Sequence, residues 1–230
     1  MRTANPDQDQ LTHALIAILV LGSLWGFSEV VVSAAIGAAG LPYRAAILTG
    51  IGMGLMAIAF AVFRKPLMPV GLAIVAILCK QLVVPILHLP LMCKANSCLA
   101  VLLQGLGAAG TTAILKRRLE SNAFARISAG PIAAVLSAVA FYSAGMRLAP
   151  CQYLLAFQGG PGFVAFLAAE AVPWAVTSAV TFPMGYALGK PLRDRLVVLR
   201  SLHPALYYGA NAAVVATSWI ASALTIAAGF

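Results

Sequence analysis

Long apolar stretches follow one another along this chain, separated by short segments that are polar or marked by proline and glycine. A helix that crosses the roughly 30 Å hydrocarbon core of a bilayer needs about 20 apolar residues. Seven stretches come near that length and predict spans over residues 11–36, 45–63, 69–89, 98–115, 127–146, 163–188 and 205–230. The pattern predicts an all-α polytopic membrane helix bundle of six to seven transmembrane helices, with residues 1–230 forming a single transmembrane domain.

The first and last spans each allow a second interpretation. The apolar run of the first span is about 26 residues long. A signal-peptide core is only about 7–15 residues long and follows a basic leader, so a transmembrane helix is favoured. The last span contains Asn211, Thr217 and Ser218, which makes six spans the alternative count.

Composition supports a membrane protein and excludes a soluble enzyme. Of the 230 residues, 62% are apolar and 9% are charged, and the mean hydropathy is +0.95. A typical soluble domain is about 45–50% apolar and about 25% charged. Disorder is excluded because low hydrophobicity is its mark. The net charge of +9 would suggest a nucleic-acid partner in a soluble protein, but here we expect the lipid bilayer and no nucleic acid.

The basic residues are divided unevenly between alternate loops, and cytoplasmic loops are enriched in Lys and Arg. Eleven of the 15 fall on one predicted side: Arg2, Arg64, Lys65, Lys116, Arg117, Arg118, Arg126, Lys190, Arg193, Arg195 and Arg200. The opposite side holds Arg44, Lys94 and Arg147, and Lys80 lies within a span. We therefore expect a cytoplasmic amino terminus and a multi-pass protein of the bacterial cytoplasmic (inner) membrane.

Three ionisable side chains fall inside the predicted spans: Glu29, Lys80 and Glu170. A charge near the bilayer centre costs roughly 2.5–3.5 kcal/mol, so each should face the bundle interior and find a partner. Lys80 is the natural partner for either glutamate. These groups either fix which helix faces touch or line a ligand or proton pathway.

Nearby side chains extend this group into a candidate small-molecule site. Trp25 precedes Glu29 by four residues, Trp174 follows Glu170 by four, and Gln104 is the amide of the fourth span. Residues four apart share a helix face, and an aromatic ring beside polar groups is typical of a small-molecule pocket. The predicted substrate-binding residues are Glu29, Lys80, Glu170, Gln104, Trp25 and Trp174.

The cysteines permit three interpretations. Cys93, Cys98 and Cys151 are predicted to lie outside, where disulfides persist, so we expect one disulfide among them without knowing which pair forms. The same cysteines with His88 and Met92 would suit a soft or borderline metal, so whether a metal binds stays open. A redox pair of Cys93 and Cys98 is the third possibility.

The sequence lacks the common catalytic motifs. It has no Gly-rich phosphate loop, no His-Glu-x-x-His helix and no Gly-x-Ser-x-Gly elbow. Its three histidines give no support to haem ligation between helices. We therefore expect a protein that is not an enzyme, and no cofactor is indicated.

The segments Leu24-Trp25-Gly26-Phe27-Ser28-Glu29 and Gly50-Ile51-Gly52-Met53-Gly54, in a chain of this size and helix count, resemble the substrate-binding S components of energy-coupling factor transporters. The resemblance covers architecture over most of the chain. It implies a protein that captures a small molecule from outside and depends on a separate membrane protein and ATPases. Our first hypothesis is such a transport subunit, with its site between the first, third, fourth and sixth spans. The alternatives are a non-catalytic subunit or assembly factor of a membrane complex, and a membrane thiol or quinone oxidoreductase.

Overall fold

The computed structural model describes residues 6–229, and none of these residues lies in a strand. The helices are α1 (Pro6–Phe27), α2 (Ser33–Ala38), α3 (Arg44–Phe63), α4 (Met68–Lys80), α5 (Val83–Leu87), α6 (Ala95–Ser121), α7 (Ala123–Leu148), α8 (Gln152–Leu155), α9 (Gly162–Phe166), α10 (Val172–Leu202) and α11 (Pro204–Ala227). A π-helical turn over Ser28–Val32 joins α1 to α2, and another over Leu167–Ala171 joins α9 to α10. Leu91–Lys94 forms a 3₁₀ turn before α6.

Seven helices of the described chain are long and apolar enough to cross a membrane, which confirms the all-α polytopic bundle. They cover Gln10–Ala38, Arg44–Phe63, Met68–Leu87, Leu91–Ser121, Ala123–Leu148, Gly162–Leu202 and Pro204–Ala227. The seventh is included because its polar side chains are bonded within the protein: Asn211 donates to the carbonyl of Tyr207 and Thr217 to that of Ala213. The count is therefore seven.

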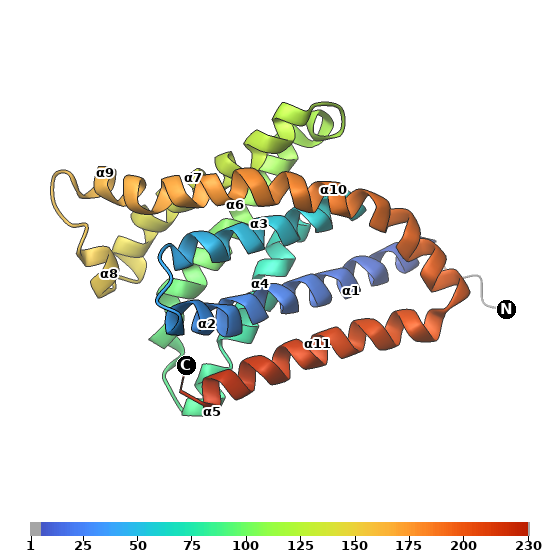
Figure 1. Ribbon diagram of the computed structural model, residues 1–230, viewed down its shortest axis with the longest axis horizontal. Helices are drawn as coiled ribbons and strands as arrows, with labels where there is room; N and C mark the ends of the chain where they lie inside the picture. Colours follow the sequence, from blue (N-terminus) through green and yellow to red (C-terminus); the bar gives the residue numbers. More distant parts are fainter. Residues whose placement is uncertain (1–5, 230) are drawn as a thin grey trace.

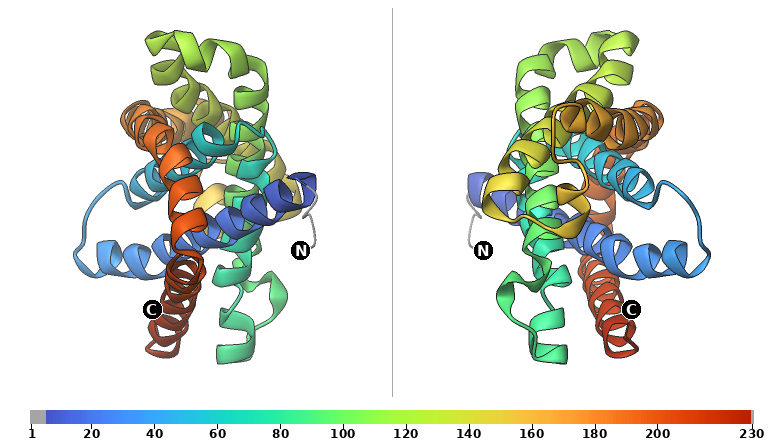
Figure 2. Two further views of the ribbon diagram at one scale, coloured as in Figure 1. Left: turned by 90° about the vertical axis from the view of Figure 1, so that its right-hand side faces the viewer. Right: turned by 90° about the vertical axis from the view of Figure 1, so that its left-hand side faces the viewer.

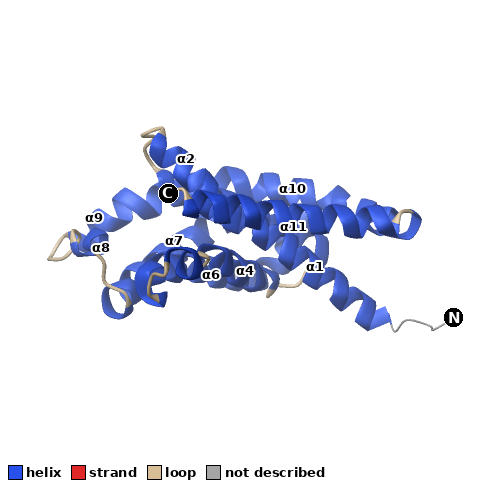
Figure 3. Cartoon of the chain, turned by 90° about the horizontal axis from the view of Figure 1, so that it is seen from below, coloured by secondary structure: helices blue, strands red, loops and turns tan. Residues whose placement is uncertain are grey.

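Successive spans run between two opposite ends of the bundle (Figures 1 and 3). One end carries the connections at residues 39–43, 88–94 and 149–161 together with the end of α11, and we call it the outer end after the orientation that the basic residues predict. The other end carries the start of α1, residues 64–67, Asn122 and His203, and we call it the inner end. Arg2, also assigned to this side, lies outside the described residues. The two ends therefore separate the loops as the alternation of basic residues requires.

The sixth span is longer than the sequence predicted. Instead of ending near residue 188, the helix continues to Leu202 and carries Lys190, Arg193 and Arg195 beyond the predicted span. Pro183 and Pro191 lie inside it, and α10 is visibly curved (Figure 1). Proline bends a helix without always ending it. The helix ends before His203 because Pro204 disfavours helical backbone at the residue that precedes it.

Glycines allow α3 and α10 to pack with their backbones nearly in contact. A methyl group added at Gly185 would overlap the carbonyl oxygen of Gly54, and one added at Gly50 would lie 3.1 Å from Thr177 Cβ. In lipid, helices associate through such close packing because no hydrophobic force draws them together. Gly110, in α6, has open space around it.

Polar side chains join α11 to the rest of the bundle. Trp219 Nε1 donates a hydrogen bond to Ser23 Oγ of α1 at 2.8 Å. The Cys79 thiol of α4 donates to Ser222 Oγ at 3.3 Å, and Ser222 donates to the carbonyl oxygen of Ser218. These bonds fix α11 across α1 and α4, and the end views show it reaching the outer end near α5 (Figure 2).

Candidate functional site: a polar cavity at the outer end

The centre of the site is an ion pair between two spans. Lys80 Nζ, on the last residue of α4, donates to Glu29 Oε2 at 2.6 Å, and the side chains are 10% and 7% exposed. Two nearly buried opposite charges each lower the desolvation cost of the other. Of the two possible partners for Lys80, the structure selects Glu29.

Both intramembrane glutamates lie in π-helical turns, Glu29 in Ser28–Val32 and Glu170 in Leu167–Ala171. A π turn is rare, contains one extra residue and is found mostly at functional sites. Ser28 Oγ donates to the carbonyl oxygen of Trp25 at 2.7 Å, so a side chain supports the first turn. The extra residue changes the direction in which the following side chains point. No pattern in the sequence predicted either turn.

Two adjoining chambers surround the ion pair. The outer one has a volume of about 260 Å³ and the inner one about 150 Å³. They share five lining residues, and these are Glu29, Ser33, Arg44, Lys80 and Ser97. Together they form one polar cavity, which we call the outer cavity. Its two parts are called the outer chamber and the deep chamber below.

The deep chamber ends at a polar pair from α6 and α3. Gln104 Nε2 donates to Thr49 Oγ1 at 3.0 Å, and both side chains are buried. The other end of the amide, Gln104 Oε1, is buried without a hydrogen-bond partner among the described residues. A buried polar atom without a partner costs about 1–3 kcal/mol. The deep chamber thus offers an acceptor that a bound molecule can satisfy.

Trp174 connects this chamber to the second glutamate. Its indole is buried against Phe141, with ring centroids 6.3 Å apart, and lines the deep chamber. Its Nε1 donates to Glu170 Oε2 at 2.9 Å. Tyr153 of α8 donates its hydroxyl to Glu170 Oε1. Glu170 therefore lies behind the cavity wall and does not line it.

The short helix α8 folds back on the bundle, one of the two placements the sequence allowed. Leu154 is fully buried, and Tyr142 of α7 donates to the carbonyl of Phe157 at 2.9 Å. Almost half of Tyr153 is exposed, yet its hydroxyl end is directed at Glu170. Burial, followed by the hydrogen bond to the carboxylate, raises the pKa of Tyr153 above its ordinary value.

Trp25 is placed differently from its prediction. The indole is fully buried, and a methyl group added at Gly52 would lie 2.7 Å from its Nε1. That Nε1 has no partner among the described residues, and Trp25 is absent from the lining of the outer cavity. It packs the α1–α3 contact beside the site. Of the six predicted residues, the structure therefore brings Glu29, Lys80, Gln104 and Trp174 to one cavity and leaves Trp25 and Glu170 outside it.

The structure joins none of the three outer cysteines in a disulfide, so that expectation is corrected. Cys93 is exposed, whereas Cys98 is buried and accepts a hydrogen bond from Gln81 Nε2 at 3.4 Å. Cys151 accepts one from Asn96 Nδ2 at 2.9 Å. Five positions along an almost continuous helix put Cys93 and Cys98 on different sides of it. Within residues 6–229 no three His, Cys, Asp or Glu side chains gather closely enough to hold a metal ion.

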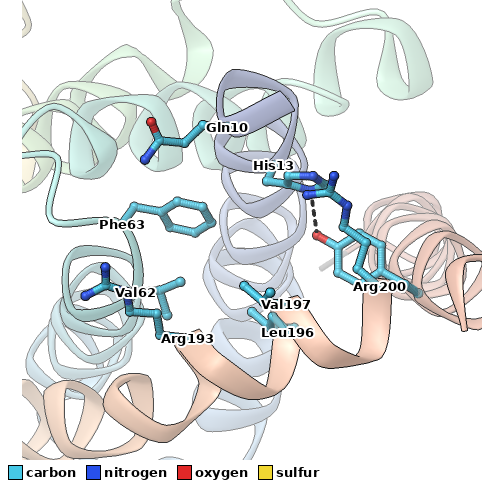
Figure 4. Close-up of a pocket in the computed structure, with 9 residues that line it drawn as sticks. Gln10, His13, Val62, Phe63, Arg193, Leu196, Val197 and Arg200 are labelled. Carbon is cyan, nitrogen blue, oxygen red and sulfur yellow. Dashed lines mark hydrogen bonds between the residues drawn. The ribbon is translucent and has the colours of Figure 1, made fainter. Parts of the chain in front are cut away.

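A second cavity, of about 320 Å³, lies at the inner end between α1, α3, α10 and α11 (Figure 4). Phe63, Leu196 and Val197 supply much of its surface, with Arg193 and Arg200 at the rim. His13 Nδ1 and Tyr207 Oη are 3.5 Å apart across it. Basic side chains at this end already follow from the predicted topology, and the intramembrane ion pair is at the other cavity. We therefore place the candidate site in the outer cavity.

Sequence reasoning missed several lining residues. Arg44, Lys94, Thr49, Ser33 and Ser97 all line the outer cavity. Arg44 and Lys94 were visible as two of only three basic residues on the predicted outer side, but they were interpreted through topology alone. Serine and threonine are common in membrane helices, so the other three carried no distinct signal.

No protein-family model, no curated protein and no solved structure matches this chain. The site is therefore interpreted from its own geometry.

Proposed function

We propose that this multi-pass membrane protein is the solute-binding subunit of a transport system and takes a small molecule into the outer cavity. The observation that carries this proposal is the position of the Glu29–Lys80 pair, which forms part of the wall of a cavity instead of lying in solid packing. A pair that served only to join helices would need no space beside it.

The deep chamber supports the same proposal. Ligand sites are concave and combine apolar walls with a few polar groups that orient the ligand. Here Leu48, Val101 and Trp174 supply the apolar wall, and Gln104 supplies a buried acceptor without a partner among the described residues. This arrangement favours solute binding over the alternative of a non-catalytic subunit, for which a closely packed bundle is expected.

We further propose that the chain works in the bacterial cytoplasmic membrane with a separate membrane protein and ATPases, as its resemblance to S components implies. The chain has no Gly-rich phosphate loop of its own, so ATP-driven uptake requires partner ATPases. The helix α11 is additional to the six that S components usually have.

Solute depletion from a defined medium tests the binding function while the substrate is still unidentified. A strain that lacks the gene is complemented with the wild-type chain or with Ser97→Phe or Ser33→Phe, which fill the cavity from α6 or α2. We expect mass spectrometry to find at least one solute that wild-type cells remove and both variants leave. Ser143→Phe, at an exposed position of α7, is the matched control and should behave as wild type.

Membrane abundance of each variant is measured by immunoblot, so that loss of protein is not taken for loss of uptake. Equal depletion by the deletion strain and the wild type would overturn the proposal. Copurification in mild detergent tests the partner: recovery of ATPases is expected, and uptake by a chain that purifies and functions alone would contradict their involvement.

A further inference from the structure

The charges around the outer cavity do not balance. Three cationic side chains, Lys80, Arg44 and Lys94, line its outer chamber with a single carboxylate, Glu29. Lys80 is already paired with that carboxylate at 2.6 Å. Among the described residues, neither Arg44 nor Lys94 forms an ion pair with an acidic side chain. With Glu29 ionised, the chamber has a formal charge of +2.

The two unpaired cations are held at this position by local backbone structure. Arg44 is the first residue of α3 and follows Tyr43, whose φ of 59° is left-handed and sharply turns the chain. Lys94 ends the 3₁₀ turn Leu91–Lys94 and directly precedes α6. They come from different connections, yet both line the same chamber with Ser97.

The first turn of α3 adds to this positive potential. Ala45 lines the deep chamber beside Arg44, and no side chain caps the start of the helix. The first backbone N–H groups of a helix have no partner within it and carry a partial positive charge. Together with the two side chains, they provide both charge and hydrogen-bond donors suited to oxygen anions.

We infer that the solute taken into the outer cavity is a small organic anion whose carboxylate or phosphate oxygens bind Arg44, Lys94 and the first turn of α3. This inference rests on the proposed function and specifies its substrate class. The Glu29–Lys80 pair forms the wall below the anionic group. The body of the solute lies against Trp174, and a hydroxyl, amide or ammonium donor at its far end bonds Gln104 Oε1.

A cationic solute is disfavoured by the same residues. It would meet Arg44 and Lys94 before it reached Glu29, and Glu29 is already neutralised by Lys80. A neutral solute would leave both outer cations without a counter-charge. Only an anion reduces the excess charge of the chamber.

Charge-selective thiol labelling tests the electrostatics independently of which solute binds. Ser97→Cys is introduced into a chain that carries Cys93→Ser, Cys98→Ala and Cys151→Ser. Its reaction rates are measured with an anionic reagent, sulfonatoethyl methanethiosulfonate, and a cationic one, the trimethylammonium analogue. After correction for their rates with a free thiol, we expect the anionic reagent to react about tenfold faster or more.

Adding Arg44→Gln and Lys94→Gln should bring the two rates close to each other. Arg147→Gln removes the same charge from the outer end but lies outside the cavity lining, and it should leave the preference intact. A cationic reagent that reacts as fast as the anionic one in the Ser97→Cys chain would overturn the inference.

The identity of the depleted solute separates this inference from the proposed function. An anion whose uptake has a half-saturating concentration raised about tenfold or more by Arg44→Gln or Lys94→Gln, but unchanged by Arg147→Gln, supports both. A neutral or cationic solute leaves the transport function standing and overturns the anion. If no depletion depends on the gene, the transport function itself fails.

Discussion

Glu29 Oε2 and Lys80 Nζ lie 2.6 Å apart, although their residues belong to different spans and are 51 positions apart in the chain. Each side chain is at most one-tenth exposed. At this depth the charge of either residue depends on the other, because desolvation of an unpaired ion is costly. The pair therefore couples the stability of α1 and α4 to the integrity of the cavity wall.

Removing one member of the pair should destabilise the protein more than removing both. Glu29→Leu or Lys80→Met alone leaves an uncompensated buried charge and should cost about 3 kcal/mol. The double variant should recover most of that loss. Thermal unfolding in mild detergent, followed by tryptophan fluorescence, gives the comparison. A double variant as unstable as the sum of the single ones would mean that the two charges do not stabilise each other.

A methyl group at Gly185 should weaken the contact between α3 and α10. Gly185→Ala forces the helix away from the carbonyl of Gly54, and we expect a loss of about 1–3 kcal/mol. Gly110→Ala, where the surrounding space is open, is the matched control and should be neutral or slightly stabilising because alanine favours the helix. Melting temperatures of the two variants test the packing directly, and equal shifts would contradict it.

The bond between Tyr153 and Glu170 should make stability depend on alkaline pH. Because the pKa of Tyr153 is raised above its ordinary value of about 10, the folded state favours the protonated phenol. Its contribution is complete below pH of about 10 and is lost as the pH rises through the raised pKa. Near pH 8, Tyr153→Phe should therefore be less stable by about 1 kcal/mol, and the difference should shrink above pH of about 10.

Thermal unfolding across that pH range measures the effect. Tyr43→Phe is the control, because Tyr43 is 66% exposed and should give a small difference from wild type. A difference for Tyr153→Phe that stays constant with pH would show that the hydroxyl contributes nothing through this bond.

Labelling of cysteines in intact cells tests both the orientation and the free thiols. A membrane-impermeant maleimide should label exposed Cys93 from outside with no reductant present. In a chain with Cys93→Ser, a cysteine introduced at Ser121, beside the α6–α7 turn, should react only after the cells are opened. The reverse accessibility would invert the predicted topology. Labelling of Cys93 that requires a reductant would show a disulfide.

Which helices form was largely predictable, because span length, polarity and basic loops act locally along the chain. The six candidate site residues also came from a local argument: ionisable and aromatic groups are costly or distinctive in a membrane. Chain position, however, does not define the surroundings of a side chain. Trp25 and Trp174 look alike in sequence, each four residues from a glutamate, yet one packs against Gly52 and the other lines the cavity.

The sequence by itself determined a membrane bundle, its alternation between two ends and the rarity of charges within it, because the cost of polar groups in lipid acts on each segment separately. The tertiary structure decided that Lys80 pairs with Glu29, that both glutamates lie in π turns and that Arg44 and Lys94 meet at one chamber. These features depend on how helices cross and where backbones approach closely. Such contacts join residues far apart in the chain, and no local pattern encodes them.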